Sequence, residues 1–408
     1  MSADGGSRGK RTVADLAALG GLPEFTETLH VGRPNIGDRG QLMERMGDLL
    51  DRRWLTNDGP LVRQFEDRVT EAAGALHCVA TCNGTAALVI AIRTLGLTGE
   101  VVLPSFTFVA TAHALWENGV RPVFCDIDPV THNIDPDRIV KLITPRTSAI
   151  LGVHLWGRPC DVGALEEVAA RHHLRLVFDA AHAFGTSVGD RPIGECGDAT
   201  VFSFHATKFV NSFEGGAVVT DDPGLAADAA LLRNFGFLDY DTVVAHGING
   251  KMSEPCAAMG LTSLEAMEGF RLVNRRHHDT YVRLLAEVPG VAVLSHEESD
   301  SPTFQYMVAE VDAEVAGIDR DRLLELLWAE NALVRRYFHP GCHRMEPYAS
   351  MAVEEPDLPS TLQVSNRVLV LPTGSAVSTD EVERLCHLIG FIVANAAEIS
   401  ERAAVNAP

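Results

Sequence analysis

Polar side chains that could do chemistry gather at the ends of two apolar runs between positions 174 and 216. The first run ends on Asp179 and His182, and the second ends on Ser203, His205 and Lys208. Apolar runs that finish on polar residues predict neighbouring buried strands with a site at the carboxyl ends of a parallel sheet. A lysine there is suited to covalent catalysis on an electrophile. A carboxylate on the adjacent strand is suited to holding a protonated ring nitrogen.

A second group of residues predicts an anion site. The apolar run 77–82 is followed by Asn83, Gly84 and Thr85, and then by a helical pattern over 86–95. Gly84 lets the backbone approach an anion, Thr85 offers a hydroxyl, and the start of the helix supplies free N–H groups. Because Asn-Gly-Thr also makes an ordinary helix cap, the pattern alone leaves both interpretations open.

Other candidate residues have simpler interpretations. Phe106 and Phe108 follow the strand pattern 101–104, and phenylalanine is most often a core residue. Asp126 and Asp128 end another strand pattern, and they fit turn residues before a proline better than metal ligands. The eight cysteines include no CxxC pair and no zinc spacing, so no metal site is predicted and reduced thiols in the cytoplasm are expected.

The elements that position these residues alternate between strand and helix over 77–235, which predicts βαβ units and a mostly parallel sheet. Within this part, 217–220 is predicted to be an edge strand, and 254–276 a single long helix. After about 280 the pattern changes to that of an α+β domain. We therefore expect an N-terminal lead-in over 1–28, a large domain over 29–280 and a small C-terminal domain over 281–408, with the first dozen residues disordered.

Charge and hydropathy exclude several classes of protein. The net charge is −21 and the pI is near 5.1, which argues against a nucleic-acid partner but leaves a local site for an anionic substrate open. No signal-peptide pattern and no run long enough to span a membrane is seen, so a membrane partner is not expected. No G-x-G-x-x-G follows a predicted strand, which disfavours a nicotinamide-dependent dehydrogenase.

The motifs DAAHAFG, SFHATK and EGG, together with NGTAAL and PSFTFVATA, closely resemble the DegT/DnrJ/EryC1/StrS aminotransferases. The resemblance runs from about Leu29 to Gly374. It implies the fold of type I pyridoxal-phosphate (PLP) enzymes, in which a seven-stranded, mostly parallel sheet lies between helices beside a smaller α+β domain. It also implies PLP as cofactor, with pyridoxamine phosphate as its aminated form.

Roles for cofactor-binding residues follow from this resemblance. Lys208 would form the Schiff base and carry the proton, Asp179 would pair with the pyridinium nitrogen, and His182 would lie beside the ring hydroxyl. The residues expected to bind the phosphate or cover the ring are Gly84, Thr85, Ser203 and Phe108. Asn249, in GINGKMS, would reach the phosphate of a partner subunit, which implies a homodimer with shared active sites.

Substrate contacts are less specific in the sequence. Thr56 and Asn57 lie where relatives approach the substrate, although a plain turn between helices is an equal alternative. His205 is expected to touch substrate or to support the lysine loop. His343 matches a histidine near the sugar, and Arg344 fits either a diphosphate contact or a structural ion pair. The segment NSFEGG departs from the TGEGG that is common in the family.

The resemblance implies an aminotransferase that moves an amino group, with L-glutamate as donor, to a nucleotide-linked keto-sugar in deoxyaminosugar biosynthesis, as in antibiotic-forming secondary metabolism. The segments LAALGGLPEF and RRYFHPGCHRMEPY favour C4 of a dTDP-4-keto-6-deoxyhexose. A 3-keto sugar and a cyclitol ketone stay open as alternative substrates. Lys208 argues against the sugar dehydratases of the same fold, which carry histidine there, and it also argues against a non-catalytic binding protein.

Overall fold

A seven-stranded sheet forms the centre of the larger part of the protein in the computed structural model, which describes residues 9–352 and 354–405. The strand order is β2 (His77–Thr81), β10 (Gly216–Thr220), β9 (Ala199–Ser203), β6 (Arg175–Asp179), β5 (Thr147–Val153), β3 (Glu100–Pro104) and β4 (Arg121–Cys125). Strand β10 runs antiparallel to both neighbours, and the others run in one direction. This confirms the predicted α/β fold with a mostly parallel sheet.

The prediction of an edge strand at 217–220 is wrong. Strand β10 lies between β2 and β9, with Val218 opposite both Val79 and Val201, and all five of its residues are buried. A strand covered on both faces reads as a continuous apolar run whether it is central or at an edge, so the sequence did not reveal its position. The edges of this sheet are β2 and β4.

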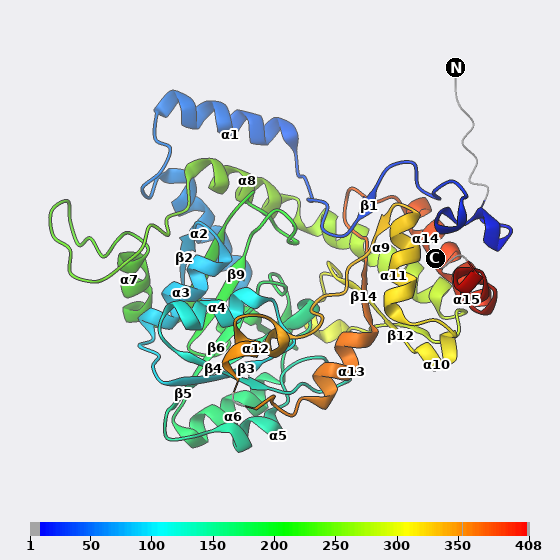
Figure 1. Ribbon diagram of the computed structural model, residues 1–408. Coiled ribbons are helices and arrows are strands. Elements are labelled where there is room, and N and C mark those ends of the chain that lie inside the picture. Colours follow the sequence, from blue (N-terminus) through cyan, green and yellow to red (C-terminus); the bar gives the residue numbers. More distant parts are fainter. Residues whose placement is uncertain (1–8, 353, 406–408) are drawn as a thin grey trace.

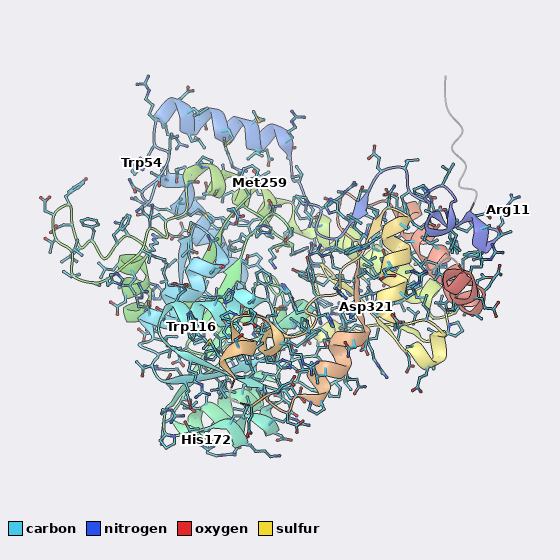
Figure 2. All side chains as sticks on the ribbon, viewed as in Figure 1. Arg11, Trp54, Trp116, His172, Met259 and Asp321 are labelled. Atoms are coloured by element: carbon cyan, nitrogen blue, oxygen red, sulfur yellow. The ribbon has the colours of Figure 1, made fainter. Side chains whose placement is uncertain are left out.

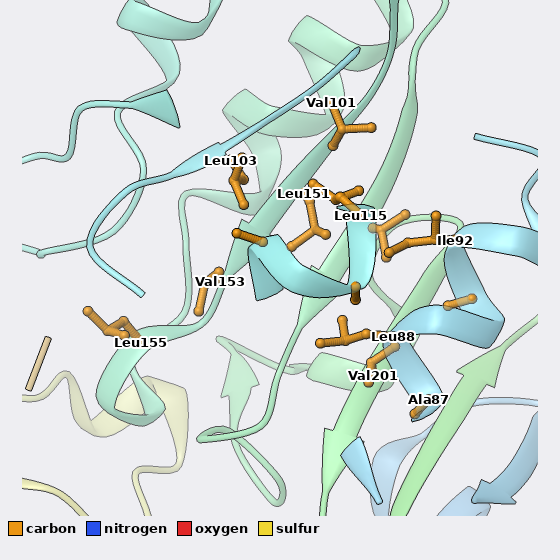
Figure 3. Packing of buried hydrophobic residues seen from close by; sticks show 14 of the residues in the cluster. Ala87, Leu88, Ile92, Val101, Leu103, Leu115, Leu151, Val153, Leu155 and Val201 are labelled. Atoms are coloured by element: carbon orange, nitrogen blue, oxygen red, sulfur yellow. The ribbon is translucent and has the colours of Figure 1, made fainter. Parts of the chain in front are cut away.

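Helices cover both faces of the sheet because side chains alternate along each strand. On one face, α3 (Gly84–Thr94), α4 (Val109–Glu117) and α7 (Pro223–Leu232) pack against alternate residues such as Val201 and Val218. Figure 3 shows this packing, with Leu88 and Ile92 of α3 beside Leu115 of α4. On the other face, Phe202 and Val219 pack with α2 (Pro60–Ala73) and α8 (Glu254–Glu265), and α6 (Val162–His172) covers β5 and β6.

The predicted single helix over 254–276 is wrong, because it breaks at Ala266. Helix α8 ends at Glu265, and α9 (Met267–Leu285) continues after Ala266, whose φ of −95° and ψ of 0° leave the regular helix. Helix α8 packs on α1 (Arg39–Arg52) and α2, whereas α9 packs on α14 (Thr379–Ala394) of the smaller part (Figure 1). Neither glycine nor proline marks the break, so the sequence carried no signal for it.

The smaller part is built on an antiparallel sheet in the order β11 (Val291–Val293), β12 (Met307–Val311) and β14 (Val368–Leu371). Helix α11 (Arg320–Ala329) and α14 pack on it. The remaining helices and paired strands are α5 (Pro136–Ile139), α10 (Ala313–Ala316), α12 (Tyr348–Met351), α13 (Pro359–Arg367), α15 (Ala396–Val405), β7 (Ser187–Val188) and β8 (Arg191–Pro192).

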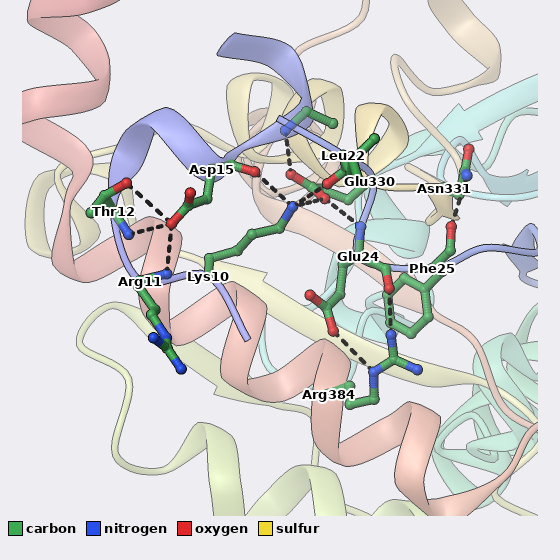
Figure 4. A network of polar contacts seen from close by, with 11 residues as sticks. Lys10, Arg11, Thr12, Asp15, Leu22, Glu24, Phe25, Glu330, Asn331 and Arg384 are labelled. Carbon is green, nitrogen blue, oxygen red and sulfur yellow. Dashed lines mark hydrogen bonds and ion pairs between the residues drawn. The ribbon is translucent and has the colours of Figure 1, made fainter. Parts of the chain in front are cut away.

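The N-terminal lead-in packs against this smaller part. Strand β1 (Leu29–His30) pairs in parallel with β13 (Ala332–Leu333), and Leu16 is buried in the same core as α14. In Figure 4, the ammonium of Lys10 lies 2.7 Å from the buried carboxylate of Glu330, which also accepts backbone N–H groups from Ala17 and Glu24. Of the dozen residues for which disorder was expected, 1–8 lie outside the described residues, and for 9–12 the expectation is wrong, since Lys10 pairs with Glu330 and the N–H of Thr12 donates to Asp15.

Candidate active site

A cavity of about 460 Å³ opens at the carboxyl ends of β2, β9 and β6. It is closed on one side by residues of the smaller part, Gln305, Tyr306, Tyr337 and Phe338. The residues predicted from the sequence that line it are Gly84, Thr85, Phe108, Asp179, His182, Ser203, His205 and Lys208. Those that do not line it are Thr56, Asn57, Asn249, His343 and Arg344.

Asp179 is the carboxylate of the site, and the fold orients both of its oxygens. It ends β6 and is 6% exposed. One oxygen accepts a hydrogen bond from the hydroxyl of Thr111 at 2.8 Å, and the other accepts from the backbone N–H of Ala181 at 3.1 Å. Burial raises the pKa of this carboxyl, while these hydrogen bonds and the charge of Lys208 lower it. A buried carboxylate so placed is suited to a cationic ring nitrogen.

Lys208 is one of four lysines in the chain and the one that lines the cavity. Its backbone N–H bonds to the carbonyl of His205, so the loop after β9 folds back and directs the side chain inward. Burial lowers its pKa to about 8, and the charge of Asp179 opposes this. About a tenth of such an amine is neutral at pH 7, far more than of an ordinary lysine, and this neutral fraction is nucleophilic.

His182 lies beside this pair in a fixed tautomer. The backbone N–H of Trp156 donates to its Nδ1 at 3.3 Å, so Nδ1 is the acceptor and Nε2 carries the proton. Burial, with a smaller contribution from the charge of Lys208, lowers the pKa of His182 well below its ordinary value. A neutral imidazole with a fixed N–H can donate to a phenolic oxygen without adding charge.

A corner of the cavity suited to an anion lies at the start of α3. The side chain of Asn83 caps the helix by accepting the N–H of Ala86 at 2.8 Å, and Gly84 and Thr85 line the cavity at its first turn. A Cβ at Gly84 would come within 2.9 Å of the Cβ of Ser203, so only glycine leaves the backbone free to meet an anion there. The Ser203 hydroxyl lies at the same corner, because β9 ends beside it.

Aromatic side chains form the wall of the cavity. Phe108 is 58% exposed, which is unusual for a phenylalanine and contradicts its interpretation as a core residue. Phe106, in contrast, is fully buried. The rings of Phe108 and Phe338 lie 6.2 Å apart. Phe108 is thus free to cover a planar ring.

His205 sits at the rim of the cavity. Its Nδ1 accepts from the backbone N–H of Thr207 at 3.3 Å, and its Nε2 lies 3.5 Å from the carboxylate of Glu214. These contacts tie the lysine loop to the EGG segment. The side chain is also half exposed, so it remains able to contact a substrate.

The predicted residues outside the cavity fall into two groups. Thr56, Asn57 and Asn249 are exposed on the surface of this chain. His343 is 3% exposed, and its Nδ1 lies 2.6 Å from the hydroxyl of Ser105. Arg344 forms an ion pair with Glu355 at 2.5 Å. A direct role in substrate binding stays a prediction for all five.

Sequence reasoning missed Tyr306 and Trp156. Tyr306 immediately precedes β12, and its hydroxyl lies 3.0 Å from Nζ of Lys208. Trp156 has a left-handed backbone with φ of 62°, and its ring stacks on Phe338 at 5.5 Å. The unusual WGRP segment was a local signal for Trp156, but nothing near Tyr306 in the sequence separates it from a core tyrosine.

These residues fit PLP. The start of α3 offers N–H groups to a phosphate, Asp179 offers a carboxylate to the pyridine nitrogen, and Lys208 offers an amine to the aldehyde. Among residues 9–352 and 354–405, no cluster of histidine, cysteine or carboxylate side chains could hold a metal ion. The same part of the chain contains no helix long and apolar enough to cross a membrane.

Comparisons with known proteins agree with this chemistry. The model of the DegT/DnrJ/EryC1/StrS aminotransferase family matches residues 38–390. A dTDP-4-amino-4,6-dideoxy-D-glucose transaminase of Shigella dysenteriae is 36% identical over 362 residues, 88% of this chain and 98% of its own. The enzyme of the same name from Escherichia coli is 34% identical, covering 89% and 98%.

Among solved structures, DesI, determined in the presence of its TDP-sugar product, has a TM-score of 0.93 at 51% identity, covering 96% of this chain and 100% of its own. DesV of S. venezuelae, determined with a ketimine intermediate, has a TM-score of 0.81 at 30% identity, covering 87% and 95%. The chain is therefore a PLP-dependent aminotransferase and belongs to the DegT/DnrJ/EryC1/StrS aminotransferase family.

Proposed function

We propose that this enzyme transfers an amino group from L-glutamate to C4 of a dTDP-4-keto-6-deoxyhexose. The observation that carries the proposal is the single cavity that holds Lys208, Asp179 and His182 beside an anion-binding helix start. The names of the Shigella and Escherichia relatives support the 4-amino product and the thymidine nucleotide. Similarity to a GDP-perosamine synthase, at 33% identity, supports a nucleotide-linked sugar more generally.

When bound, PLP supplies an electron sink that stabilises negative charge at the carbon losing or gaining a proton. The chain supplies the rest. Lys208 moves the proton with an amine whose pKa of about 8 suits both its uptake and its release. Asp179 would hold the ring nitrogen, and neutral His182 would offer its Nε2–H to the ring oxygen. The start of α3 would hold the phosphate, and the aromatic wall would pack against the ring.

The substrate assignment is tested by offering the enzyme a panel of ketones with PLP and glutamate. dTDP-4-keto-6-deoxyglucose should yield a dTDP-4-amino-4,6-dideoxyhexose, identified by mass spectrometry and NMR. Aspartate, glutamine and alanine replace glutamate in parallel reactions to test the donor. Turnover of only the 3-keto isomer or a cyclitol ketone would overturn the assignment to C4 while leaving the aminotransferase intact.

We also propose a homodimer with shared active sites. Asn249 is exposed and does not line the cavity of its own chain, which fits a role in a partner's site. Large apolar side chains are also exposed on two segments, as expected for an interface between subunits. They are Ile36, Met43, Leu50, Trp54 and Leu55 around α1, and Phe235, Phe237, Leu238, Tyr240, Val243 and Val244 on the loop after α7. That loop projects away from the body of the protein in Figure 1, and Trp54 lies at the outer end of α1 in Figure 2.

Subunit mixing tests the shared site. The variants Lys208→Ala and Asn249→Ala should each have little activity alone. Each heterodimer should contain one site with both residues intact, and so should have up to about half of wild-type activity, or about a quarter when averaged over a random mixture of dimers. Absence of recovery in heterodimers proven by native mass spectrometry, with the Asn249 variant inactive alone, would place Asn249 in the site of its own chain.

The proposed setting is the cytoplasm, where thiols stay reduced. All eight cysteines are free, which suits that compartment. A part in antibiotic biosynthesis remains a prediction from the resemblance.

A further inference from the structure

Tyr306 makes the one side-chain hydrogen bond seen for Lys208 in the described part of the chain. Its phenolic oxygen lies 3.0 Å from Nζ of Lys208. Tyr306 is only 7% exposed, and its ring packs against His182 with centroids 4.0 Å apart and against Trp156 at 5.8 Å. The phenol therefore reaches the lysine from a ring that its neighbours hold in place.

A phenol can serve both protonation states of an amine. It accepts a hydrogen bond from an ammonium, and it donates one to a neutral amine. Burial raises the pKa of Tyr306 well above its ordinary value, so its own proton remains available for donation. A carboxylate could only accept, and a second lysine could only donate, so neither would serve both states.

We infer that Tyr306 is the positioning residue that holds the free amine of Lys208 in place while this amine takes up and releases a proton. The inference rests on the proposed role of Lys208 as proton carrier. A group that carries a proton must stay within transfer distance of the reacting atoms in both of its protonation states. A small displacement of those atoms lowers the reaction rate. Without the phenol, the methylene groups of Lys208 are free to rotate. Among the described residues, Nζ would then have no hydrogen-bond partner that fixes its position.

None of the other titratable groups that line this cavity makes a hydrogen bond to the amine of Lys208 in the described part of the chain. They are Asp179, His182, His205, Glu214 and Tyr337. Asp179 acts on Lys208 through its charge, and both of its oxygens are already engaged by Thr111 and Ala181. His182 has Nδ1 engaged by Trp156. His205 and Glu214 lie at the rim and face each other.

The test is Tyr306→Phe, which removes one oxygen and keeps the packed ring. The matched control is Tyr348→Phe, because Tyr348 is 4% exposed and its hydroxyl lies 2.7 Å from a histidine nitrogen, that of His113, away from the cavity. Both variants lose one buried hydrogen bond to a nitrogen. Only the first should alter Lys208.

The first measurement needs no turnover. Cofactor-free protein is labelled with trace acetic anhydride across a pH series, and acetylation of each lysine is quantified by peptide mass spectrometry. With four lysines in the chain, exposed Lys141 serves as internal reference. A hydrogen bond stabilises an ammonium more than a neutral amine, so Tyr306→Phe should lower the pKa of Lys208 by about one further unit.

The second measurement uses the loaded enzyme. Tyr306→Phe should lower kcat about 10- to 100-fold while KM stays within about twofold of wild type. Tyr348→Phe should change neither the pKa of Lys208 nor kcat. An unchanged pKa of Lys208 in Tyr306→Phe would overturn the inference, as would equal losses in the two variants. If the wild type aminates none of the ketones, the proposed function fails, and the labelling series still decides whether Tyr306 holds the amine.

Discussion

Replacing Lys208 by alanine should abolish transamination while leaving the fold intact. In the proposed mechanism the side chain supplies the nucleophilic amine and the proton carrier, so we expect kcat to fall by on the order of 10⁴-fold or more. The loss should come with little change in stability, since a buried amine is costly to desolvate and its removal relieves that cost. Steady-state assays, with circular dichroism to follow the fold, measure both effects.

Absorption spectroscopy separates this role from a merely structural one. Wild-type protein should be yellow, and borohydride should bleach it and fix the cofactor covalently on Lys208. The Lys208→Ala variant should bind the cofactor without a covalent link and should release it on dialysis after the same treatment. The control is Lys141→Ala, which removes an exposed lysine and should behave as wild type. Multiple turnovers by Lys208→Ala would end the assignment of this residue as the covalent lysine.

The sequence predicted the centre of this site because its residues follow short apolar runs in order. Asp179 and Ser203 each end a strand, and neighbouring parallel strands bring such ends together without any long-range information. Phe108 required the family resemblance, because an isolated phenylalanine is normally a core residue. Its 58% exposure is a property of the folded surface that no local pattern encodes.

Residues that meet across long separations were beyond sequence reasoning. Tyr306 reaches Lys208 from 98 positions away, at the start of an apolar strand in which its hydroxyl gives no signal. The interior position of β10, between β2 and β9, was missed for a related reason. Strand order depends on contacts between distant segments, which a local sequence pattern does not encode. His343 was predicted to lie near the sugar, and in the structure its Nδ1 lies 2.6 Å from the hydroxyl of Ser105. The motif alone could not distinguish a substrate contact from such an internal hydrogen bond.

Replacing Asp179 by asparagine should lower kcat by on the order of a thousandfold, because this removes the charge that we propose keeps the ring nitrogen protonated. The amide is nearly the same size as the carboxyl, and its oxygen can still accept the hydrogen bond from Thr111. The fold around β6 should therefore persist. The rate should fall without a matching rise in KM for the sugar, since the proposed partner of Asp179 is the cofactor and not the sugar.

A second buried carboxylate gives the control for this variant. Asp126 is 1% exposed and accepts hydrogen bonds from Ser360 and Thr361, and it lies outside the cavity. Asp126→Asn removes a buried charge just as Asp179→Asn does, so it should affect thermal unfolding but change kcat by less than about threefold.

An Asp179→Asn enzyme whose kcat stays within about threefold of wild type would show that the ring nitrogen does not depend on this carboxylate. A thousandfold loss in that variant alone, with the bound cofactor absorbing at an altered wavelength, would place the negative charge of Asp179 at the ring. The two hydrogen-bond donors at this strand end and the charge of Lys208 would then oppose the effect of burial and keep one carboxylate ionised where a cation must be held.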